Sequence, residues 1–588
     1  MRLHQNAELR TALLRCRRAF FGVGVMSGII NILYLTGSFF MLEVYDRVIP
    51  ARSIPTLVGL GLLTLTLFLF QGLIETIRAR VLARIGSSLD EALSGRVFDM
   101  VVRHPLEAPA GGDGLLPLRD LDQIRNFFSS LGPTAIFDLP WMPIYLGICF
   151  LFHPLIGIAG LAGALVLAAL TLLTELLTRR PQREATQYGA SRNALSEAGR
   201  QNAEVLRAMG MQKEFAQIWN AENNAYMRRQ RRVADIAAGL GTTSKIFRMV
   251  LQSAVLALGA YLVIQGQATG GIIIASSILV SRALAPAEIA IANWKGFVAA
   301  RQGWVRLHDM LARFTPDKPA LALPAPVRSL TVENASILPP GGTRAIVSDV
   351  SFGLKAGEGV GIIGPSASGK STLARALVGV WTPMRGAIRL DGATLDQRSG
   401  GSLGRHVGYL PQDVELFAGT IASNIARLAP DPNAEAVVAA SRSAGVHELI
   451  LRLPEGYETR IGPGGAGLSA GQRQRIGLAR ALYGDPFLVV LDEPNANLDE
   501  AGEAALTQAL LGVRMRGGIV VVVAHHPSVL AAVDLVLVME EGRARAFGRK
   551  NEVLKTNLRP TAFPNVRTPK RTITATANPA ETNLKASA

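Results

Sequence analysis

Hydrophobic and polar positions alternate on two different length scales along this chain. In residues 1–310, long apolar runs are separated by polar segments, and six of the runs approach the roughly 20 residues that an α-helix needs to cross a bilayer. The predicted spans cover about residues 19–42, 54–74, 134–152, 155–177, 246–264 and 272–291. The first half is therefore predicted to be an all-α transmembrane domain, covering residues 19–310.

The charge of the connecting segments predicts the orientation of these spans. Residues 1–18 carry five Arg and one Glu, and residues 178–245 carry twelve Lys or Arg. The connections after the first, third and fifth spans are short and have no net positive charge. Because basic connections stay on the cytoplasmic side, we expect residues 1–18, both long connections and both termini in the cytoplasm. The two long connections also predict helices that continue well beyond the lipid.

A few residues in or beside the spans call for an explanation of their own. Arg282 lies in the sixth span, where a charge is costly, so it contacts a translocated substrate, forms a structural ion pair or lies at the membrane interface. Pro140 and Pro143 are expected to kink the third span. The two cysteines, Cys16 and Cys149, exclude a disulfide framework and are expected to pack as small apolar residues.

The second half has the shorter period of a soluble domain. Residues 327–553 alternate short β-rich runs with helical runs, which predicts an α/β fold. A Pro-rich linker, residues 311–326, precedes this domain. Residues 554–588 are rich in Thr, Lys, Pro and Ala and are predicted to be a disordered tail.

Residues 364–372 read GPSASGKST and fit the phosphate-binding P-loop pattern. An apolar run leads into them and a helical run follows, which is the strand–loop–helix context that the motif needs. Lys370 should reach the β- and γ-phosphates of a nucleotide, and the Ser371 hydroxyl should bind Mg²⁺. The predicted nucleotide-binding residues of this loop are Gly364, Pro365, Ser366, Ala367, Ser368, Gly369, Lys370, Ser371 and Thr372.

Four further residues are candidates for catalysis together with Lys370. An apolar run ends in Asp492 and Glu493, which could hold Mg²⁺ and polarise the attacking water, respectively. Gln412 follows a strand, and its amide could reach both Mg²⁺ and that water. His525 ends another apolar strand and could contact the γ-phosphate. Each alone could be an ordinary surface or loop residue. Together, however, they all lie at the ends of strands in one α/β unit, which favours a shared site.

A Gly-rich turn before a predicted helix offers a second anion site. Ser469 and Gly471 lie at the start of this helix, where backbone N–H groups point outward. At this point the motifs resemble those of an ATP-binding cassette (ABC) transporter, with LSAGQ as its signature, LVVLDE as Walker B and NLD as its D-loop. The resemblance implies that Ser469, Gly471 and Gln472 bind the γ-phosphate of ATP held by another protomer, so a homodimer is expected. Asp499 of the D-loop is a further predicted nucleotide-binding residue.

Two departures from this family bear on the predicted site. Ala470 replaces the usual glycine of the signature, which we expect to be tolerated if its φ is not positive. Residues 336–340 hold no aromatic side chain on which adenine could stack. The adenine would then rest on an apolar or proline face.

A narrower resemblance covers nearly the whole chain. Residues 35–48, 137–146, 281–286 and 408–425 are similar to type I secretion permease/ATPases, in the branch that exports proteases. This resemblance implies a bacterial inner-membrane exporter, with six transmembrane helices followed by an α/β P-loop nucleotide-binding domain. It also implies ATP and Mg²⁺ as cofactors, a periplasmic adaptor (membrane fusion) protein and an outer-membrane channel as partners, and an unfolded secreted protein with a C-terminal signal as substrate.

Composition narrows the alternatives without removing all of them. The chain is 49% hydrophobic and has a net charge of +16, and the basic residues lie beside apolar runs. A membrane protein in contact with lipid explains this better than a nucleic-acid-binding protein. Two other functions stay open: an ABC exporter of lipids or small molecules, and an ATP-binding regulatory or channel-like protein without turnover.

Overall fold

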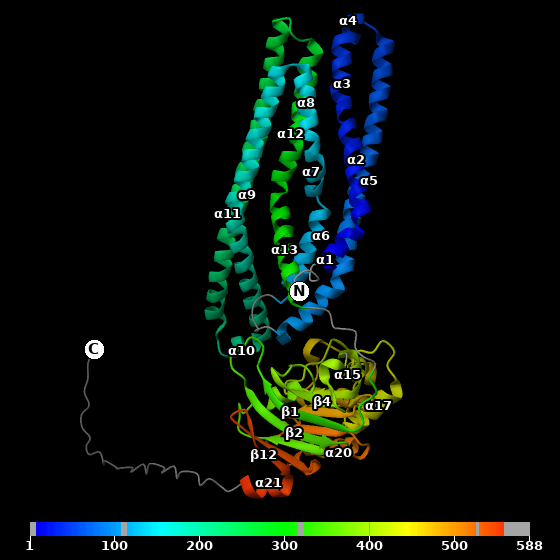
Figure 1. Cartoon of the computed structure of the whole chain (residues 1–588), viewed down its shortest axis with the longest axis vertical. Coiled ribbons are helices and arrows are strands. Elements are labelled where there is room, and N and C mark those ends of the chain that lie inside the picture. The colour runs from blue at the N-terminus through cyan, green and yellow to red at the C-terminus, as the bar shows by residue number, and fades with distance from the viewer. Residues whose placement is uncertain (1–6, 108–113, 315–322, 399, 525–528, 558–588) are drawn as a thin grey trace, which may run out of the picture. The chain divides into compact units, whose positions relative to one another are not determined.

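The computed structural model describes residues 7–107, 114–314, 323–398, 400–524 and 529–557 (Figure 1). The chain forms two compact units, Met1–Pro316 and Asp317–Ala588. The first unit is all-α and the second is α/β, in agreement with the predicted fold classes.

The first unit is built from helices of very different length. They are α1 (Ala7–Arg15), α2 (Arg17–Leu33), α3 (Leu35–Glu43), the π-helix η1 (Val44–Val48), α4 (Ile49–Ala51), α5 (Ile54–Glu107), α6 (Leu116–Phe128), α7 (Gly132–Asp138), the 3₁₀ turn η2 (Leu139–Trp141), α8 (Met142–Phe152), α9 (Pro154–Gln201), α10 (Ala203–Ala208), α11 (Gln212–Ile264), α12 (Gly270–Ala292) and α13 (Trp294–Arg313).

Six helical segments of the described chain are long and apolar enough to cross a membrane. They are residues 17–51, 54–107, 132–152, 154–201, 212–264 and 270–292, and each contains one of the predicted spans. The chain is therefore a multi-pass membrane protein. Helices α5, α9 and α11 have 54, 48 and 53 residues, about 70–80 Å at 1.5 Å per residue, so they extend far beyond the roughly 30 Å hydrocarbon core.

Helices α9 and α11 lie side by side along much of their length (Figure 1). The two backbones come close because glycines of α9 face α11. A Cβ atom on Gly163 would lie 2.1 Å from a methyl group of Leu251, so a larger residue there would require the Leu251 side chain to move.

The predicted disturbance of the third span is present in the structure. The 3₁₀ turn η2, which contains Pro140, separates α7 from α8. Proline has no backbone N–H to donate, so an uninterrupted helix is disfavoured at this point. Cys16 and Cys149 are buried free thiols, as expected of small packing residues.

Arg282 of α12 contacts an aromatic ring. Its guanidinium carbon lies 4.4 Å from the centroid of the Tyr34 ring, a cation–π contact, and the residue is exposed. Arg282 has no ion pair among the described residues.

The second unit contains twelve described strands with short helices between them. The strands are β1 (Ser329–Ile337), β2 (Val347–Lys355), β3 (Gly359–Ile363), β4 (Arg385–Leu390), β5 (Ala393–Thr394), β6 (Val407–Leu410), β7 (Gly419–Thr420), β8 (Arg460–Ile461), β9 (Leu488–Asp492), β10 (Ile519–Val523), β11 (Leu535–Glu540) and β12 (Arg543–Arg549). The main helices are α14 (Lys370–Leu377), α15 (Gly400–His406), α16 (Ile421–Ile425), α17 (Ala434–Ser443), α18 (His447–Leu451), α19 (Ala470–Leu482), α20 (Glu500–Met515) and α21 (Lys550–Asn557), with 3₁₀ turns η3 (Leu395–Gln397), η4 (Gly456–Glu458), η5 (Pro463–Gly465) and η6 (Val529–Ala532).

A six-stranded sheet in the order β12-β11-β3-β10-β9-β6 forms the centre of this unit. It is parallel except for β12, and an antiparallel sheet in the order β2-β1-β4-β5 accompanies it. Successive residues of β9 enter two different cores: Leu488 packs in one with Leu373 of α14, and Val489 packs in the other with Ile476 of α19. Both faces of the sheet are thus covered, which explains why β3, β9 and β10 are continuous apolar runs.

Two boundaries fall a few residues inside the segments predicted to be irregular. Helix α13 continues to Arg313, three residues into the predicted linker, because Leu311 and Phe314 are buried against neighbouring helices. Helix α21 reaches Asn557 because Val553 packs beside β11, so helix continues past the predicted start of the tail at residue 554. Residues 558–588, and 315–322 of the linker, lie outside the described residues.

Candidate active site

The predicted P-loop connects β3 to α14. At its start, a Cβ on Gly364 would lie 2.1 Å from the carbonyl oxygen of Met539, so a side chain cannot fit there. At its end, Gly369 has φ +93° and precedes the first helical residue, Lys370. The loop therefore curls tightly and directs the first N–H groups of α14 into its own concavity, which is a geometry suited to phosphate.

The ammonium group of Lys370 lies over this loop. Its Nζ donates hydrogen bonds to the carbonyl oxygens of Gly364, at 3.0 Å, and Pro365, at 2.8 Å. Burial lowers the pKa of Lys370 below its usual range, although the nearby carboxylates of Glu493 and Asp492 act in the opposite direction. A cation is thus held where phosphate oxygens would enter.

A hydroxyl and a carboxylate converge beside the loop. The Ser371 Oγ donates to Asp492 Oδ1 at 3.2 Å, and Asp492 is only 1% exposed. Burial raises the pKa of Asp492, helped by the charge of Glu493 and opposed by the Ser371 hydrogen bond. The other oxygen, Oδ2, is buried and accepts no hydrogen bond from the described residues.

This donor set fits Mg²⁺. Oxygen ligands from one hydroxyl and one carboxylate, with room for water and phosphate oxygens, are what this ion takes in nucleotide sites. The described residues contain no cluster of three or more His, Cys, Asp or Glu side chains that would suit a metal bound by protein alone. The buried, unpartnered Oδ2 of Asp492 is the atom that a cation would satisfy.

Gln412 and Glu493 meet at the rim of the same site. The Gln412 Nε2 donates to Glu493 Oε2 at 3.1 Å. Glu493 directly follows β9 and has φ +49°, a left-handed conformation that is rare for a residue with a side chain, while its N–H donates to Val523 O at 3.0 Å. This turn at the end of the strand presents the carboxylate at the opening of the loop.

The second predicted anion site stands at the start of α19. Ser469 caps the helix: its Oγ accepts from the Gln472 N–H at 3.2 Å, and the Gln472 Oε1 accepts from the Ser469 N–H at 2.8 Å. Ala470 is the first helical residue, and it is not among the residues with positive φ, so the condition for tolerating alanine there is met. A Cβ on Gly471 would lie 2.8 Å from the Asn497 carbonyl oxygen, which requires glycine at this contact.

Asp499 has a structural partner within its own chain. Its carboxylate caps α20 by accepting from the Gly502 N–H at 2.9 Å, and it forms an ion pair with Arg475. The Gly502 hydrogen bond lowers the pKa of Asp499, and Arg475 adds to this. Its own protomer therefore fixes Asp499 beside α19 rather than at the P-loop.

The structure thus sorts the predicted residues into two groups. Lys370, Ser371, Gln412, Asp492 and Glu493 come together around the P-loop. The signature residues and Asp499 form a separate group at the first turns of α19 and α20. His525 lies outside the described residues.

Sequence reasoning missed two groups of residues near the site. A hollow of about 1260 Å³ borders the P-loop at Ala367, and its other walls include Arg344, Ile346 and Arg543. The described residues that line it include no aromatic side chain, in line with the sequence of residues 336–340. Gln474 and Asn497 connect α19 to the segment after β9, a contact that no local pattern indicates.

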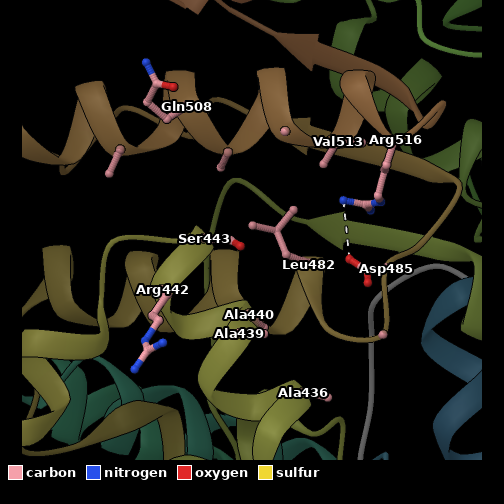
Figure 2. Close-up of a pocket in the computed structure, with 14 residues that line it drawn as sticks. Ala436, Ala439, Ala440, Arg442, Ser443, Leu482, Asp485, Gln508, Val513 and Arg516 are labelled. Carbon is pink, nitrogen blue, oxygen red and sulfur yellow. Dashed lines mark ion pairs between the residues drawn. The ribbon is translucent and has the colours of Figure 1, made fainter.

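Another hollow, of about 420 Å³, lies between α17, α20 and the end of α19 (Figure 2). Small side chains such as Ala440 line most of it, and Arg516 forms an ion pair with Asp485 at 3.5 Å. None of the candidate active-site residues that the structure describes reaches this hollow.

Comparison with known proteins gives matches to both halves of the chain. The family model "ABC transporter transmembrane region" matches residues 20–284, and the model "ABC transporter" matches residues 347–496. The chain is 58% identical to the type I secretion system ATP-binding protein PrsD of Rhizobium meliloti (strain 1021), over 95% of this chain and 96% of that protein.

The chain is also similar, at lower identity, to other translocation ATP-binding proteins and to a solved ABC exporter structure. The toxin RTX-I translocation ATP-binding protein of Actinobacillus pleuropneumoniae is 29% identical over 92% of this chain and 77% of its own length. The α-hemolysin translocation ATP-binding protein HlyB of Escherichia coli is 28% identical with the same coverage. A solved structure of a bacterial Atm1-family ABC exporter matches with a TM-score of 0.79 and 22% identity, over 92% of this chain and 96% of that one, which shows the fold.

Proposed function

We propose a function from one premise: the chain belongs to the ABC transporter family, among the ATP-binding proteins of type I secretion systems. In this proposal the protein is an ATPase of the bacterial inner membrane that exports unfolded proteins with a C-terminal signal. The observation that carries this proposal is the convergence of Ser371–Asp492 and Gln412–Glu493 at a P-loop, on a chain with six membrane-crossing helices.

The residues around the P-loop divide the chemistry of ATP hydrolysis among them. Lys370 and the N–H groups at the start of α14 bind the phosphates. Ser371, Asp492 and Gln412 hold Mg²⁺, which when bound neutralises charge on the β- and γ-phosphates. Glu493 orients the attacking water and accepts its proton, and His525 contacts the γ-phosphate. Most of the rate gain then comes from positioning and charge stabilisation.

A homodimer completes the site in this proposal. Ser469 and Gln472 bond to each other and Asp499 bonds to Gly502 and Arg475, none of which belongs to the P-loop, and Ser469 and Ala470 at the start of α19 are exposed. A second copy in head-to-tail arrangement would bring this positive helix end to the γ-phosphate. ATP binding would then close the two nucleotide-binding domains, and hydrolysis would reopen them.

The remaining parts of the proposal concern transport. The basic connecting segments support a cytoplasmic location for both termini and for the nucleotide-binding domain. A periplasmic adaptor and an outer-membrane channel would carry the secreted protein onward. The 58% identity to PrsD favours protein over lipid or small-molecule cargo, and the complete Asp492–Glu493–Gln412 group favours turnover over a purely regulatory role.

The test compares culture medium from cells with the wild-type protein, Lys370→Ala and Glu493→Gln. We expect both variants to remove a small set of proteins from the medium and to retain them inside cells. Purified Glu493→Gln should bind ATP but not hydrolyse it. An unchanged set of secreted proteins, with an active wild-type ATPase, would instead point to lipid or small-molecule transport.

A further inference from the structure

Gln474 is a buried amide that the proposed mechanism leaves unused. It projects from the second turn of α19 and is 2% exposed. Its Nε2 donates to the carbonyl oxygens of Pro494, at 2.8 Å, and Glu493, at 3.3 Å, while its Oε1 accepts from Asn497 Nδ2 at 2.9 Å. The amide can adopt only this orientation, because backbone carbonyl oxygens accept and do not donate.

Two of these bonds act on the backbone that carries the Glu493 carboxylate. Glu493 sits in the left-handed region, with φ +49°, so the surrounding contacts must hold this turn in place. Gln412 donates to the carboxylate at the end of the Glu493 side chain, and Gln474 donates to the backbone carbonyl oxygens of Glu493 and Pro494. Glu493 is thus positioned by two amides from two different elements.

The third bond ties this unit to the D-loop, residues 497–499. Nearby, Gly471 packs against the Asn497 carbonyl oxygen and Arg475 pairs with Asp499. The first two turns of α19 therefore contact the segment after β9 through three residues, Gly471, Gln474 and Arg475. Of these three residues, Gln474 also donates a hydrogen bond to the backbone of Glu493.

We propose that Gln474 is a positioning residue for ATP hydrolysis, which fixes the Glu493 carboxylate and joins it to the D-loop and the signature end of α19. Its amide is buried and hydrogen-bonded to Glu493, Pro494 and Asn497, so it acts through Glu493 and not on the nucleotide directly. A displacement of α19 when a partner's nucleotide binds would reach Glu493 through Gln474. This inference rests on the proposed ATPase function.

The test uses two substitutions of nearly the same shape as glutamine. Gln474→Met removes all three hydrogen bonds without adding charge. Gln474→Glu keeps the acceptor for Asn497 but, when ionised, turns a carboxylate toward two carbonyl oxygens. For both we expect kcat for ATP to fall about 10- to 100-fold at pH 8 while KM changes less than about 3-fold, because the nucleotide contacts are intact and the base is misplaced.

The pH profile separates positioning from a general loss of packing. At about pH 6 the carboxyl group introduced by Gln474→Glu can be protonated in its buried site and donate one hydrogen bond, so this variant should recover part of its kcat relative to wild type. Gln474→Met should show the same relative loss at both pH values. Gln508→Glu, the same change at an exposed position of α20, is the matched control and should leave kcat unchanged.

The D-loop part of the inference has its own variant. Asn497 is exposed, so Asn497→Ala should fold normally, lower kcat about 3-fold and add little to the effect of Gln474→Met in the double variant. Fully additive effects would show that the two residues do not act as one unit.

Different failures are distinguishable. If Glu493→Gln abolishes hydrolysis but both Gln474 variants keep the wild-type kcat, the positioning role is refuted while the proposed function stands. If Gln474→Met raises KM as much as it lowers kcat, the residue serves nucleotide binding or folding instead. If the wild-type protein hydrolyses no ATP, both proposals fall together.

Discussion

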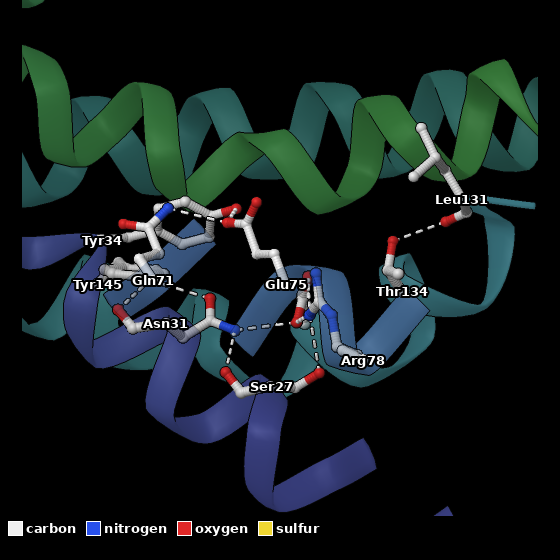
Figure 3. Close-up of polar contacts among 10 residues, drawn as sticks. Ser27, Asn31, Tyr34, Gln71, Glu75, Arg78, Leu131, Thr134 and Tyr145 are labelled. Atoms are coloured by element: carbon white, nitrogen blue, oxygen red, sulfur yellow. Dashed lines mark hydrogen bonds and ion pairs between the residues drawn. The ribbon is translucent and has the colours of Figure 1, made fainter. Parts of the chain in front are cut away.

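Replacing Asp138 by Asn should destabilise the membrane domain strongly, although the two side chains have almost the same shape. Asp138 of α7 forms an ion pair with Arg78 of α5, with 2.9 Å between Oδ1 and Nη1. The two side chains are 9% and 8% exposed. Figure 3 shows Arg78 beside Ser27 and Asn31, which belong to the same polar cluster. Ser27 and Asn31 of α2 complete the cluster: Arg78 donates to the Ser27 hydroxyl, and the Asn31 amide donates to Asp138.

The size of the effect follows from the burial of both charges. Asparagine keeps one acceptor oxygen, so the bonds from Arg78 and Asn31 to Oδ1 can persist. The substitution removes the negative charge, places an NH2 group where Oδ2 accepts from Arg78 at 3.2 Å, and leaves the Arg78 guanidinium uncompensated. Removing one partner of a buried pair costs about 3–5 kcal/mol. Coulomb's law gives the same order, about 4 kcal/mol for unit charges about 4 Å apart at an effective dielectric constant of about 20. The ratio of folded to unfolded protein should fall by at least about two orders of magnitude.

The assay is thermal unfolding of the purified, detergent-solubilised protein at a fixed scan rate, with resistance to proteolysis as a second probe. Glu197→Gln is the matched control, because both Glu197 and its Arg200 partner are exposed, and water screens such a pair so that its loss should hardly change stability. The double variant Arg78→Met/Asp138→Leu should be much closer to wild type than Asp138→Asn, since well-packed apolar residues can replace a buried pair. If Asp138→Asn and Glu197→Gln unfold at the same temperature, the argument from burial is wrong.

Three other predictions concern single contacts. Burial alone would raise the pKa of Asp391, but three backbone N–H groups that donate to its carboxylate bring this pKa below its usual value overall. The ionised carboxylate therefore stabilises the fold above the pKa that Asp391 has in the unfolded chain, and this stabilisation is lost as pH falls through the lowered pKa of the folded protein. Asp391→Asn should thus lower the unfolding midpoint at about pH 7, and the gap to wild type should narrow below about pH 4. Asp46 accepts from the Gly271 N–H at 2.7 Å in the first turn of α12, so Asp46→Ala should cost about 1 kcal/mol in unfolding experiments, whereas Asp46→Asn, which keeps an acceptor, should cost less. Ala470→Gly should change ATPase kcat less than about 2-fold, because residue 470 already has helical geometry; a large gain would mean that alanine distorts the signature.

The agreement between sequence and structure is best where a feature is encoded by neighbouring residues. An apolar strand, a Gly-rich loop and a helix start lie next to one another around Lys370, so the P-loop could be predicted as a unit. The same holds for Asp492 and Glu493, which directly follow the apolar run of β9. The six spans were found because lipid imposes a minimum apolar length on each helix separately.

Contacts between distant segments were not predictable in this way. Arg78 and Asp138 are 60 residues apart, and either charge alone would have been assigned to a polar boundary of its span. Asp46 and Gly271 are 225 residues apart, and Gln474 looks like an ordinary polar residue of a helix. The contact of Arg282 with the Tyr34 ring likewise joins residues that are far apart in the sequence.

The sequence by itself determined the type of each element, the order of the two domains and the identity of the phosphate-binding loop. These depend on hydrophobic period, apolar length and local backbone requirements, which act over one or two turns of chain. Only the tertiary structure decided which polar groups pair, because the partner of a buried charge or amide is chosen by the packing of whole helices and strands. That is why the sequence predicts the residues of the P-loop, while the residues that hold Glu493 and Asp138 in place are visible only in the folded protein.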